Sequence, residues 1–161
     1  MTRQLIRPAT WASIGAMVVL GAALAFAAAA VARAQHKAED DSSVSHEYRG
    51  IQLGMLADEV RKKLGDPKDK GDEQDFFVFG EAETAQIVYD KAHKVITISA
   101  DFLTTASAIP TAKQILGTEI EAKADGSIYK LVRFPKAGYW LSYNRTSGTS
   151  PLTTVTFQKI Q

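Results

Sequence analysis

The chain contains no cysteine. This absence excludes disulfide bonds, thiolate metal sites, a cysteine nucleophile and lipid modification of an N-terminal cysteine. A large charge of either sign is also missing, because 19 Lys and Arg residues stand against 18 Asp and Glu residues. Three of the basic residues, Arg3, Arg7 and Arg33, lie in the first 34 positions. The rest of the chain is therefore slightly acidic and has no overall basic footprint for a nucleic acid.

Acidic residues are absent from the first 34 positions. Arg3 and Arg7 come first, residues 8–32 carry no charge, and Ala32 and Ala34 have the spacing of a signal-peptidase site. We predict that residues 1–34 are a signal peptide cleaved after Ala34, or else an N-terminal anchor held in the inner membrane by residues 8–32. Both alternatives export the remainder, so we expect a periplasmic or secreted protein of the cell envelope.

Large apolar residues are scarce in the stretch that follows, residues 35–49, which is rich in charge and serine. Such a composition buries little surface, and it predicts a flexible tether over 35–49. His36 and His46 lie ten residues apart in this stretch without a cluster of further ligands around them. We therefore expect no metal site there.

The stretch GIQLGMLADEVRKKLGDP, residues 50–67, predicts a short amphipathic helix. Leu56, Val60 and Leu64 recur every four residues, and charged residues occupy the other faces. Gly65 suits the left-handed residue after the last turn, and Pro67 prevents continuation. The glycines of GIQLG lack the Lys-Ser/Thr of a P-loop and the third glycine and preceding strand of a dinucleotide-binding loop, so we expect no phosphate site or cofactor.

Three β-branched and aromatic runs follow the helix, at residues 75–79, 85–90 and 94–102. The polar breaks between them are too short for a parallel return, so the runs predict an antiparallel three-strand meander. Residues 50–104 would then form one unit of a helix and a meander.

The same order recurs in residues 105–161, which we predict to be a second unit. EVRKKLG (59–65) aligns with TAKQILG (111–117), which places Leu64 over Leu116 and Gly65 over Gly117. In the later strands DFFVF (75–79) corresponds to SIYKLVRF (127–134), QIVYD (86–90) to WLSYN (140–144), and VITISADF (95–102) to LTTVTFQK (152–159). Thr105 or Ser107 would cap the second helix.

The predicted fold class is thus α+β. Tandem units, each a helix plus a three-strand antiparallel meander, would form one continuous antiparallel sheet with both helices on one face. Such a sheet offers a broad surface rather than a deep cleft.

The segment YRGIQLGMLADEVRKKLGDP, residues 48–67, resembles the start of the SmpA/OmlA domain, found in the small lipoprotein of the bacterial outer-membrane barrel-assembly machinery. The resemblance implies that Gly54 and Met55 position the opening turn, that Val60 and Leu64 fill the core, and that Gly65 and Pro67 end the helix. Leu56 stands where the family often has a capping threonine. The tandem layout is similar to that of the β-lactamase inhibitory protein.

No catalytic constellation is expected. His93 lies in the turn DKAHK with Asp90 and Asp101 near it only in sequence, and the triad geometry needs far more than that. Glu81 and Glu83 fit a solvated loop better than a glycosidase pair. The sequence therefore predicts a protein that is not an enzyme.

Aromatic residues gather late in the chain, and we take Tyr129, Tyr139, Trp140 and Tyr143 as candidate protein-binding residues. Tyr139 and Trp140 must face opposite sides of one strand, so part of this set belongs to the core. The predicted function is a non-enzymatic interaction module that binds an envelope or secreted protein through its sheet. The alternatives are a secreted enzyme inhibitor of the β-lactamase-inhibitor type, and a small periplasmic ligand-binding protein or hydrolase.

Overall fold

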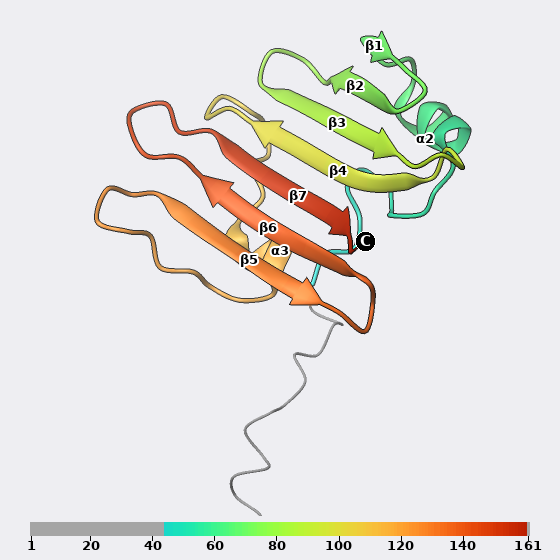
Figure 1. Cartoon of the computed structure of the whole chain (residues 1–161). Coiled ribbons are helices and arrows are strands. Elements are labelled where there is room, and N and C mark those ends of the chain that lie inside the picture. Colours follow the sequence, from blue (N-terminus) through green and yellow to red (C-terminus); the bar gives the residue numbers. More distant parts are fainter. Residues whose placement is uncertain (1–43, 161) are drawn as a thin grey trace, which may run out of the picture. The chain divides into compact units, whose positions relative to one another are not determined.

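The structure, a computed structural model, describes residues 44–160. The predicted signal peptide or anchor, His36 and the first part of the predicted tether lie outside the described residues. The described part is mainly β-structure with two short helices (Figure 1). Its elements follow in the order α2 (Ala57–Leu64), β1 (Asp69–Lys70), β2 (Gln74–Val78), β3 (Glu83–Tyr89), β4 (Val95–Phe102), α3 (Ala112–Leu116), β5 (Ile128–Phe134), β6 (Tyr139–Arg145) and β7 (Thr153–Lys159).

The seven strands form one antiparallel sheet in the order β1-β2-β3-β4-β7-β6-β5. Strands β2 to β4 pair in sequence order, and β5 to β7 do the same. The two halves meet where β4 pairs with β7, with Ile98 opposite Phe157 and Ala100 opposite Val155. The predicted continuous antiparallel sheet is therefore confirmed, and the two-residue β1 extends it by a strand that the sequence did not predict.

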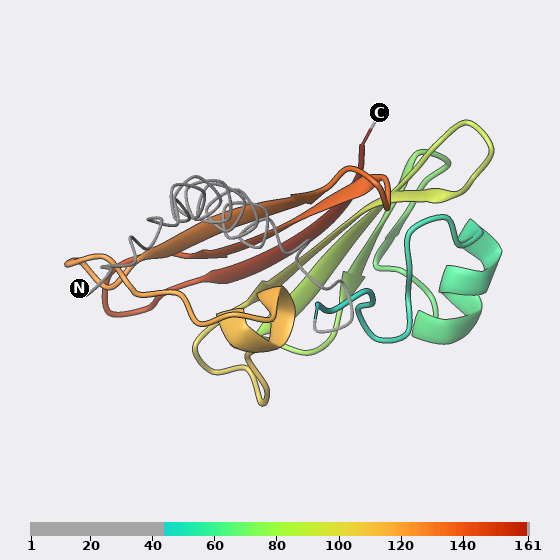
Figure 2. The same ribbon diagram turned by 90° about the horizontal axis from the view of Figure 1, so that it is seen from below.

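Both helices lie on the same face of the sheet (Figure 2). Alternate strand residues point to this covered face, and they include Ile87, Ile98 and Leu141, which are completely buried. Val60 of α2 and Ile115 of α3 belong to the same hydrophobic core. Full burial of an aliphatic side chain of this size contributes about 1.5–3 kcal/mol, so this one layer of side chains accounts for much of the stability.

The leading segment, residues 44–56, also packs against the covered face. Val44, Tyr48 and Ile51 are buried in the core, although the sequence placed residues up to 49 in a flexible tether. Gly54, at φ 86°, donates its N–H to the Val95 carbonyl at 2.8 Å, and the Val95 N–H donates to the Met55 carbonyl at 2.9 Å. Gly54 and Met55 thus join the leading segment to the start of β4, and the packed domain begins before Gly50.

Helix α2 begins without a side-chain cap, because Leu56 occupies the N-cap position. The Glu59 carboxylate accepts the Leu56 N–H at 3.1 Å, which supplies half of a capping box. Val60 is completely buried and Leu64 packs against the core. After Leu64, Gly65 has φ 87° and ψ −164°, so the prediction of a left-handed residue here was wrong. This conformation is open essentially to glycine alone, and Pro67 follows two residues later.

Helix α3 is capped by Thr111, so the prediction of Thr105 or Ser107 was wrong. The Thr111 hydroxyl accepts the Gln114 N–H at 3.2 Å, and the Gln114 side chain accepts the Thr111 N–H at 2.8 Å. The spacing Thr-x-x-Gln is a capping box, and reading it would have placed the helix start correctly. Leu116 is buried, and Gly117 ends the helix in the left-handed conformation at φ 73° and ψ −1°.

In residues 44–160, no helix is both long and apolar enough to cross a membrane.

Candidate functional site

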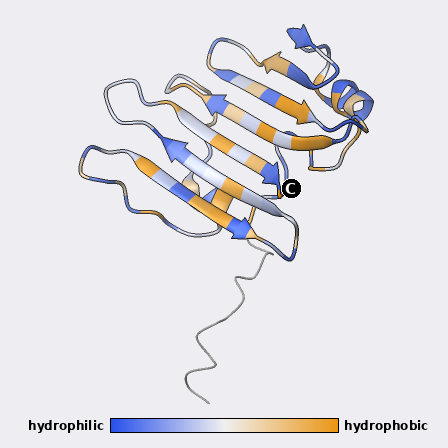
Figure 3. Ribbon diagram, in the orientation of Figure 1, coloured by the Kyte–Doolittle hydropathy of each residue, from blue (hydrophilic) through white to orange (hydrophobic). Residues whose placement is uncertain are grey.

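The sheet face opposite the helices is not covered by any element of the described residues (Figure 2), and we call it the open face. Hydrophobic and hydrophilic residues alternate along the strands (Figure 3), as expected when only one face is buried. At the centre of the open face the side chains are hydroxyls, an amide and one carboxylate. They come from β4 and β7: Thr97, Ser99, Asp101, Thr154, Thr156 and Gln158.

The central polar side chains bond to one another across the strands. The Thr154 hydroxyl donates to the Asp101 carboxylate at 2.6 Å, and the Ser99 and Thr156 hydroxyl oxygens lie 3.3 Å apart. Towards β2, the Gln86 amide donates to Gln74 at 2.7 Å. These bonds hold the polar groups in place, which lowers the entropy lost when a partner binds.

Apolar side chains stand at both ends of the open face. Phe76 and Val78 of β2 are 37% and 46% exposed, and Tyr129 of β5 is 59% exposed. Five strand spacings separate β2 from β5, a width of about 24 Å, and a seven-residue strand is about 23 Å long. The face is therefore on the order of 550 Å² in projection, which suits one small protein–protein interface.

The structure separates the four candidate aromatic residues into two pairs. Tyr129 and the half-buried Trp140 lie on the open face. Tyr139 and Tyr143 are buried on the covered face, and Tyr139 stacks on Phe134 with ring centroids 4.9 Å apart. The Tyr143 hydroxyl donates to the Pro110 carbonyl at 3.1 Å. Tyr139 and Tyr143 are therefore core residues, inaccessible to a partner on the open face.

A buried ion pair joins α2 to β2. Asp75 is completely buried, and its carboxylate accepts hydrogen bonds from Arg61 Nε at 2.8 Å, from Arg61 Nη2 at 3.1 Å and from the Tyr89 hydroxyl at 2.8 Å. The Gly71 N–H adds a fourth bond at 3.2 Å. Burial by itself raises the pKa of Asp75, but the donors from Arg61, Tyr89 and Gly71 outweigh it and hold the pKa below its usual value. Burial and the neighbouring Asp75 raise the pKa of Tyr89.

A second pair ties the leading segment to the start of β3. Arg49 donates to both oxygens of Glu83 at 2.8 and 2.7 Å, and the Tyr48 hydroxyl donates to Glu83 at 2.8 Å. The Arg49 guanidinium also lies 4.3 Å from the centroid of the Phe79 ring. Hydrogen bonds from Arg49 lower the pKa of Glu83 despite its partial burial. Glu83 is thus a structural anion and not the solvated loop residue that the sequence suggested.

Both ion pairs were missed by sequence reasoning because their partners are far apart in the chain. Arg61 and Asp75 are 14 residues apart, and Arg49 and Glu83 are 34 apart. One feature of the sequence could have indicated the Arg61–Asp75 pair. Asp75 lies two residues before Phe77 in β2, so both side chains point to the buried face, where a carboxylate needs a partner.

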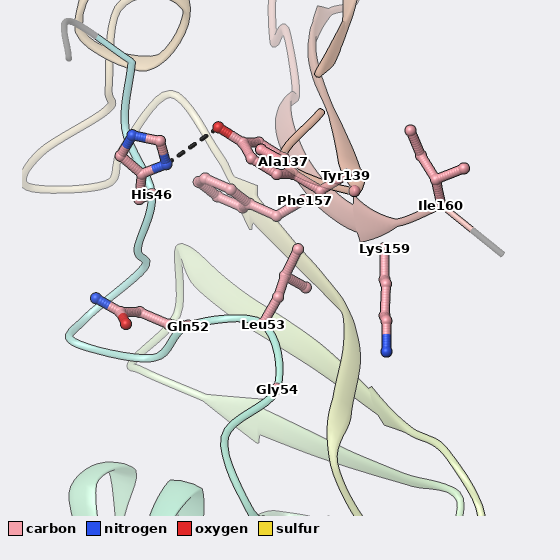
Figure 4. Close-up of a pocket in the computed structure, with 10 residues that line it drawn as sticks. His46, Gln52, Leu53, Gly54, Ala137, Tyr139, Phe157, Lys159 and Ile160 are labelled. Atoms are coloured by element: carbon pink, nitrogen blue, oxygen red, sulfur yellow. Dashed lines mark hydrogen bonds between the residues drawn. The ribbon is translucent and has the colours of Figure 1, made fainter. Parts of the chain in front are cut away.

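A pocket of about 420 Å³ lies between the leading segment and the ends of β6 and β7 (Figure 4). Leu53 and Phe157 form its apolar part, and the Tyr139 hydroxyl lies 3.0 Å from His46 Nδ1 at its rim. The Lys159 side chain points away from His46 in this view. The pocket is large enough for a small organic molecule.

The histidine considered for catalysis, His93, is exposed in the β3–β4 turn at φ 54°. The Asp90 carboxylate accepts the N–H groups of Ala92 and Lys94 at 2.9 and 3.0 Å, so its oxygens hold the turn. A shallow pocket of about 340 Å³ beside His93 is lined by Leu56, Ala57, Asp58, Arg61, Asp72 and Ala92, none of which carries a hydroxyl nucleophile. Within residues 44–160 no three His, Cys, Asp or Glu side chains are grouped to hold a metal ion.

No protein-family model, no curated protein and no solved structure matches this chain.

Proposed function

We propose that the chain is an exported, non-enzymatic interaction module of a bacterial cell envelope, which binds an envelope or secreted protein through the open face. The observation that carries the proposal is the uncovered face itself, with apolar side chains at both ends and a hydrogen-bonded polar centre. The hydrogen-bonded polar groups at the centre need no reordering when a partner binds, which lowers the cost of association. Tyrosine and tryptophan, here Tyr129 and Trp140, are the residue types that most often dominate binding energy.

We further propose that the domain consists of two tandem units, residues 50–104 and 105–161. The alignment of residues 95–102 with 152–159 makes Ser99 equivalent to Thr156, and these two residues are direct partners between β4 and β7. Two equivalent residues face each other when a local two-fold axis relates two units, so this register supports the proposal. The same relation makes Ile87 equivalent to Tyr143, because Ile87 pairs with Ile98 and Tyr143 with Val155. The alignment of Tyr89 with Tyr143 is then two residues out of register.

The resemblance to the SmpA/OmlA domain, and in layout to the β-lactamase inhibitory protein, is part of the same proposal. Its support is the opening turn at Gly54 and Met55, the buried Val60 and the end of the helix at Gly65, which have the places that the resemblance implies. Export rests on the leader-like residues 1–34 of the sequence. If the chain is an inhibitor of this type, it should inhibit a purified β-lactamase in a dose-dependent way. No inhibition at micromolar concentration would contradict the inhibitor hypothesis.

The proposal is tested by site-specific photo-crosslinking in the native envelope. A crosslinker at Thr156, in the middle of the open face, should capture a partner that a crosslinker at Lys113 of α3 does not. For the identified partner, the double variant Tyr129→Ala and Trp140→Ala should weaken binding at least tenfold, while the exposed loop variant Leu103→Ala should not. Equal capture from both crosslinkers, or equal affinity of both variants, would contradict the open-face proposal.

A second candidate, a small-ligand carrier, is favoured by the pocket of about 420 Å³ next to His46 and Phe157. This function predicts that a small apolar compound perturbs the resonances of Leu53 and Phe157 in NMR titrations. A compound that instead perturbed only the open face would count against it.

A further inference from the structure

Strand β5 forms one edge of the sheet. It pairs with β6 on one side, and no strand among residues 44–160 pairs with its other side. With seven residues it is about 23 Å long, so it presents a full-length row of backbone donors and acceptors. The opposite edge, β1, has only two residues and offers no comparable template.

Strand β5 and the residues after it carry charge of a single sign, whereas the loop that leads into β5 carries Glu119, Glu121 and Asp125. From Gly126 to the C-terminus the sequence carries five basic residues and no acidic one. Lys130 and Arg133 lie on β5 and Lys136 follows in the turn to β6, and all three are exposed. The chain as a whole is close to neutral, so this half of the sheet is a local basic region that the overall composition conceals.

The two cations of β5 flank the strand on both faces of the sheet. Lys130 pairs with Tyr143, whose side chain is buried on the covered face, and Arg133 pairs with Trp140 on the open face. A strand added beside β5 would have its side chains directed alternately to these same two faces. Acidic side chains directed to both faces would therefore each meet a cation.

We propose that the β5 edge binds an acidic, extended polypeptide segment of a partner as an additional strand. The backbone groups of β5 supply the pairing, and Lys130 and Arg133 select negative charge on the two faces. The inference goes beyond the open-face proposal, because it uses the edge of the sheet and different side chains. Either surface can bind without the other.

The placement of the cations favours this occupant over two others. A second copy of the chain, paired antiparallel through β5, would place the Lys130 side chains of both copies on one face and the Arg133 side chains of both on the other, and like charges close together across two strands are unfavourable. Basic residues on an edge strand are indeed a common defence against such self-pairing. An anionic lipid surface would contact the cations of one face only, whereas the cations of β5 are divided between two faces.

The test uses the full chain and a fluorescent peptide Val-Glu-Glu-Val-Val-Glu-Glu-Val, in which neighbouring glutamates point to opposite faces of an added strand. We expect saturable binding that weakens at least tenfold in the variant Lys130→Glu with Arg133→Glu. The matched control is Lys68→Glu with Lys91→Glu, which reverses two exposed charges away from β5 and should leave the affinity unchanged. The same peptide with every backbone N–H methylated should lose binding, because it cannot donate hydrogen bonds to the edge from either side.

Three results would overturn the proposal. The first is that the N-methylated peptide binds as tightly as the unmethylated one. The second is that the control charge reversals weaken peptide binding as much as the β5 reversals do. The third is that phosphatidylglycerol vesicles displace the peptide and the bound peptide leaves the β5 amides unprotected in hydrogen exchange. The variant Phe76→Ala, at the far end of the open face, should leave peptide binding intact. Failure of the edge proposal is thereby distinguished from failure of the open-face proposal.

Discussion

Arg61 on α2 and Asp75 on β2 form a two-pronged ion pair, with Nε 2.8 Å from Oδ2 and Nη2 3.1 Å from Oδ1. The Asp75 side chain is completely buried and that of Arg61 is 19% exposed. Nη2 also donates to the Gly71 carbonyl at 2.9 Å. One side chain therefore fixes the helix to β2 and to the turn that leads into it.

Removal of either partner should be strongly destabilising, because it leaves a buried group unsatisfied. We expect Arg61→Met and Asp75→Asn each to lower the free energy of unfolding by about 3–5 kcal/mol, and the double variant to cost less than the sum of the two. Urea unfolding measured by circular dichroism gives the values.

The second ion pair provides the control. Arg49 is 44% exposed and its partner Glu83 only 13%, so Arg49→Met should cost no more than about 1 kcal/mol. If Arg49→Met lowers the free energy of unfolding as much as Arg61→Met does, burial is not what decides how much each ion pair contributes to stability.

The lowered pKa values of Asp75 and Glu83 predict how stability depends on pH. Near pH 4 the unfolded carboxyls, with pKa values of about 3.9 and 4.3, bind more protons than the folded ones, so stability rises with pH in this range. The contribution should be complete above about pH 5 and be lost as the pH falls through the folded pKa values.

The measurement is the free energy of unfolding from pH 7 to pH 3. The variant Glu83→Gln should show a smaller decrease below pH 5 than the unaltered chain, and the variant Glu81→Gln should show no difference. Parallel curves for all three chains would contradict the assignment of Glu83 as an acid-sensitive anchor.

Local patterns predicted the regular elements well. The helix at 57–64 and the strands β2 to β7 lie within a few residues of the stretches that β-branched, aromatic and helical periodicities indicate. Strand β1 could not be recognised, because Asp69 and Lys70 have no apolar alternation and pair only through their backbones. Local polarity likewise concealed Val44 and Tyr48, which depend on a core built from residues far away in the chain.

The candidate site was predicted less well than the fold. Alternation showed that Tyr139 and Trp140 face opposite sides, but not which side the helices would cover. That choice depends on how α2 and α3 pack, through contacts such as Tyr143 with Pro110, and local sequence carries no signal for it. The sequence also could not show that β5 is a free edge. Its position at the edge follows from the pairing of β4 with β7, which joins strands far apart in the chain.

The two glycines that end the helices should respond differently to substitution. Gly117 is left-handed, a conformation that asparagine tolerates, so Gly117→Ala should cost about 1 kcal/mol and Gly117→Asn less. Gly65, with ψ −164°, lies in a region essentially restricted to glycine, so alanine and asparagine should both cost about 1–3 kcal/mol. A Cβ at Gly65 would meet no atom within 4 Å, so a loss in thermal or urea unfolding reports backbone strain alone. Rescue of Gly65 by asparagine would contradict this distinction.

Helix α2 lacks the cap that α3 has, and this difference predicts a stabilising substitution. Leu56 is 45% exposed, and its N–H is already bonded to Glu59, so Leu56→Thr would supply the missing hydroxyl at little cost in burial. We expect the free energy of unfolding to rise by about 1 kcal/mol, and Thr111→Val, which removes the cap of α3, to lower it by a similar amount. The control Leu103→Thr replaces an equally exposed leucine in a loop and should change little. If Leu56→Thr destabilises the chain, Leu56 contributes more through packing at the opening turn than a cap can replace.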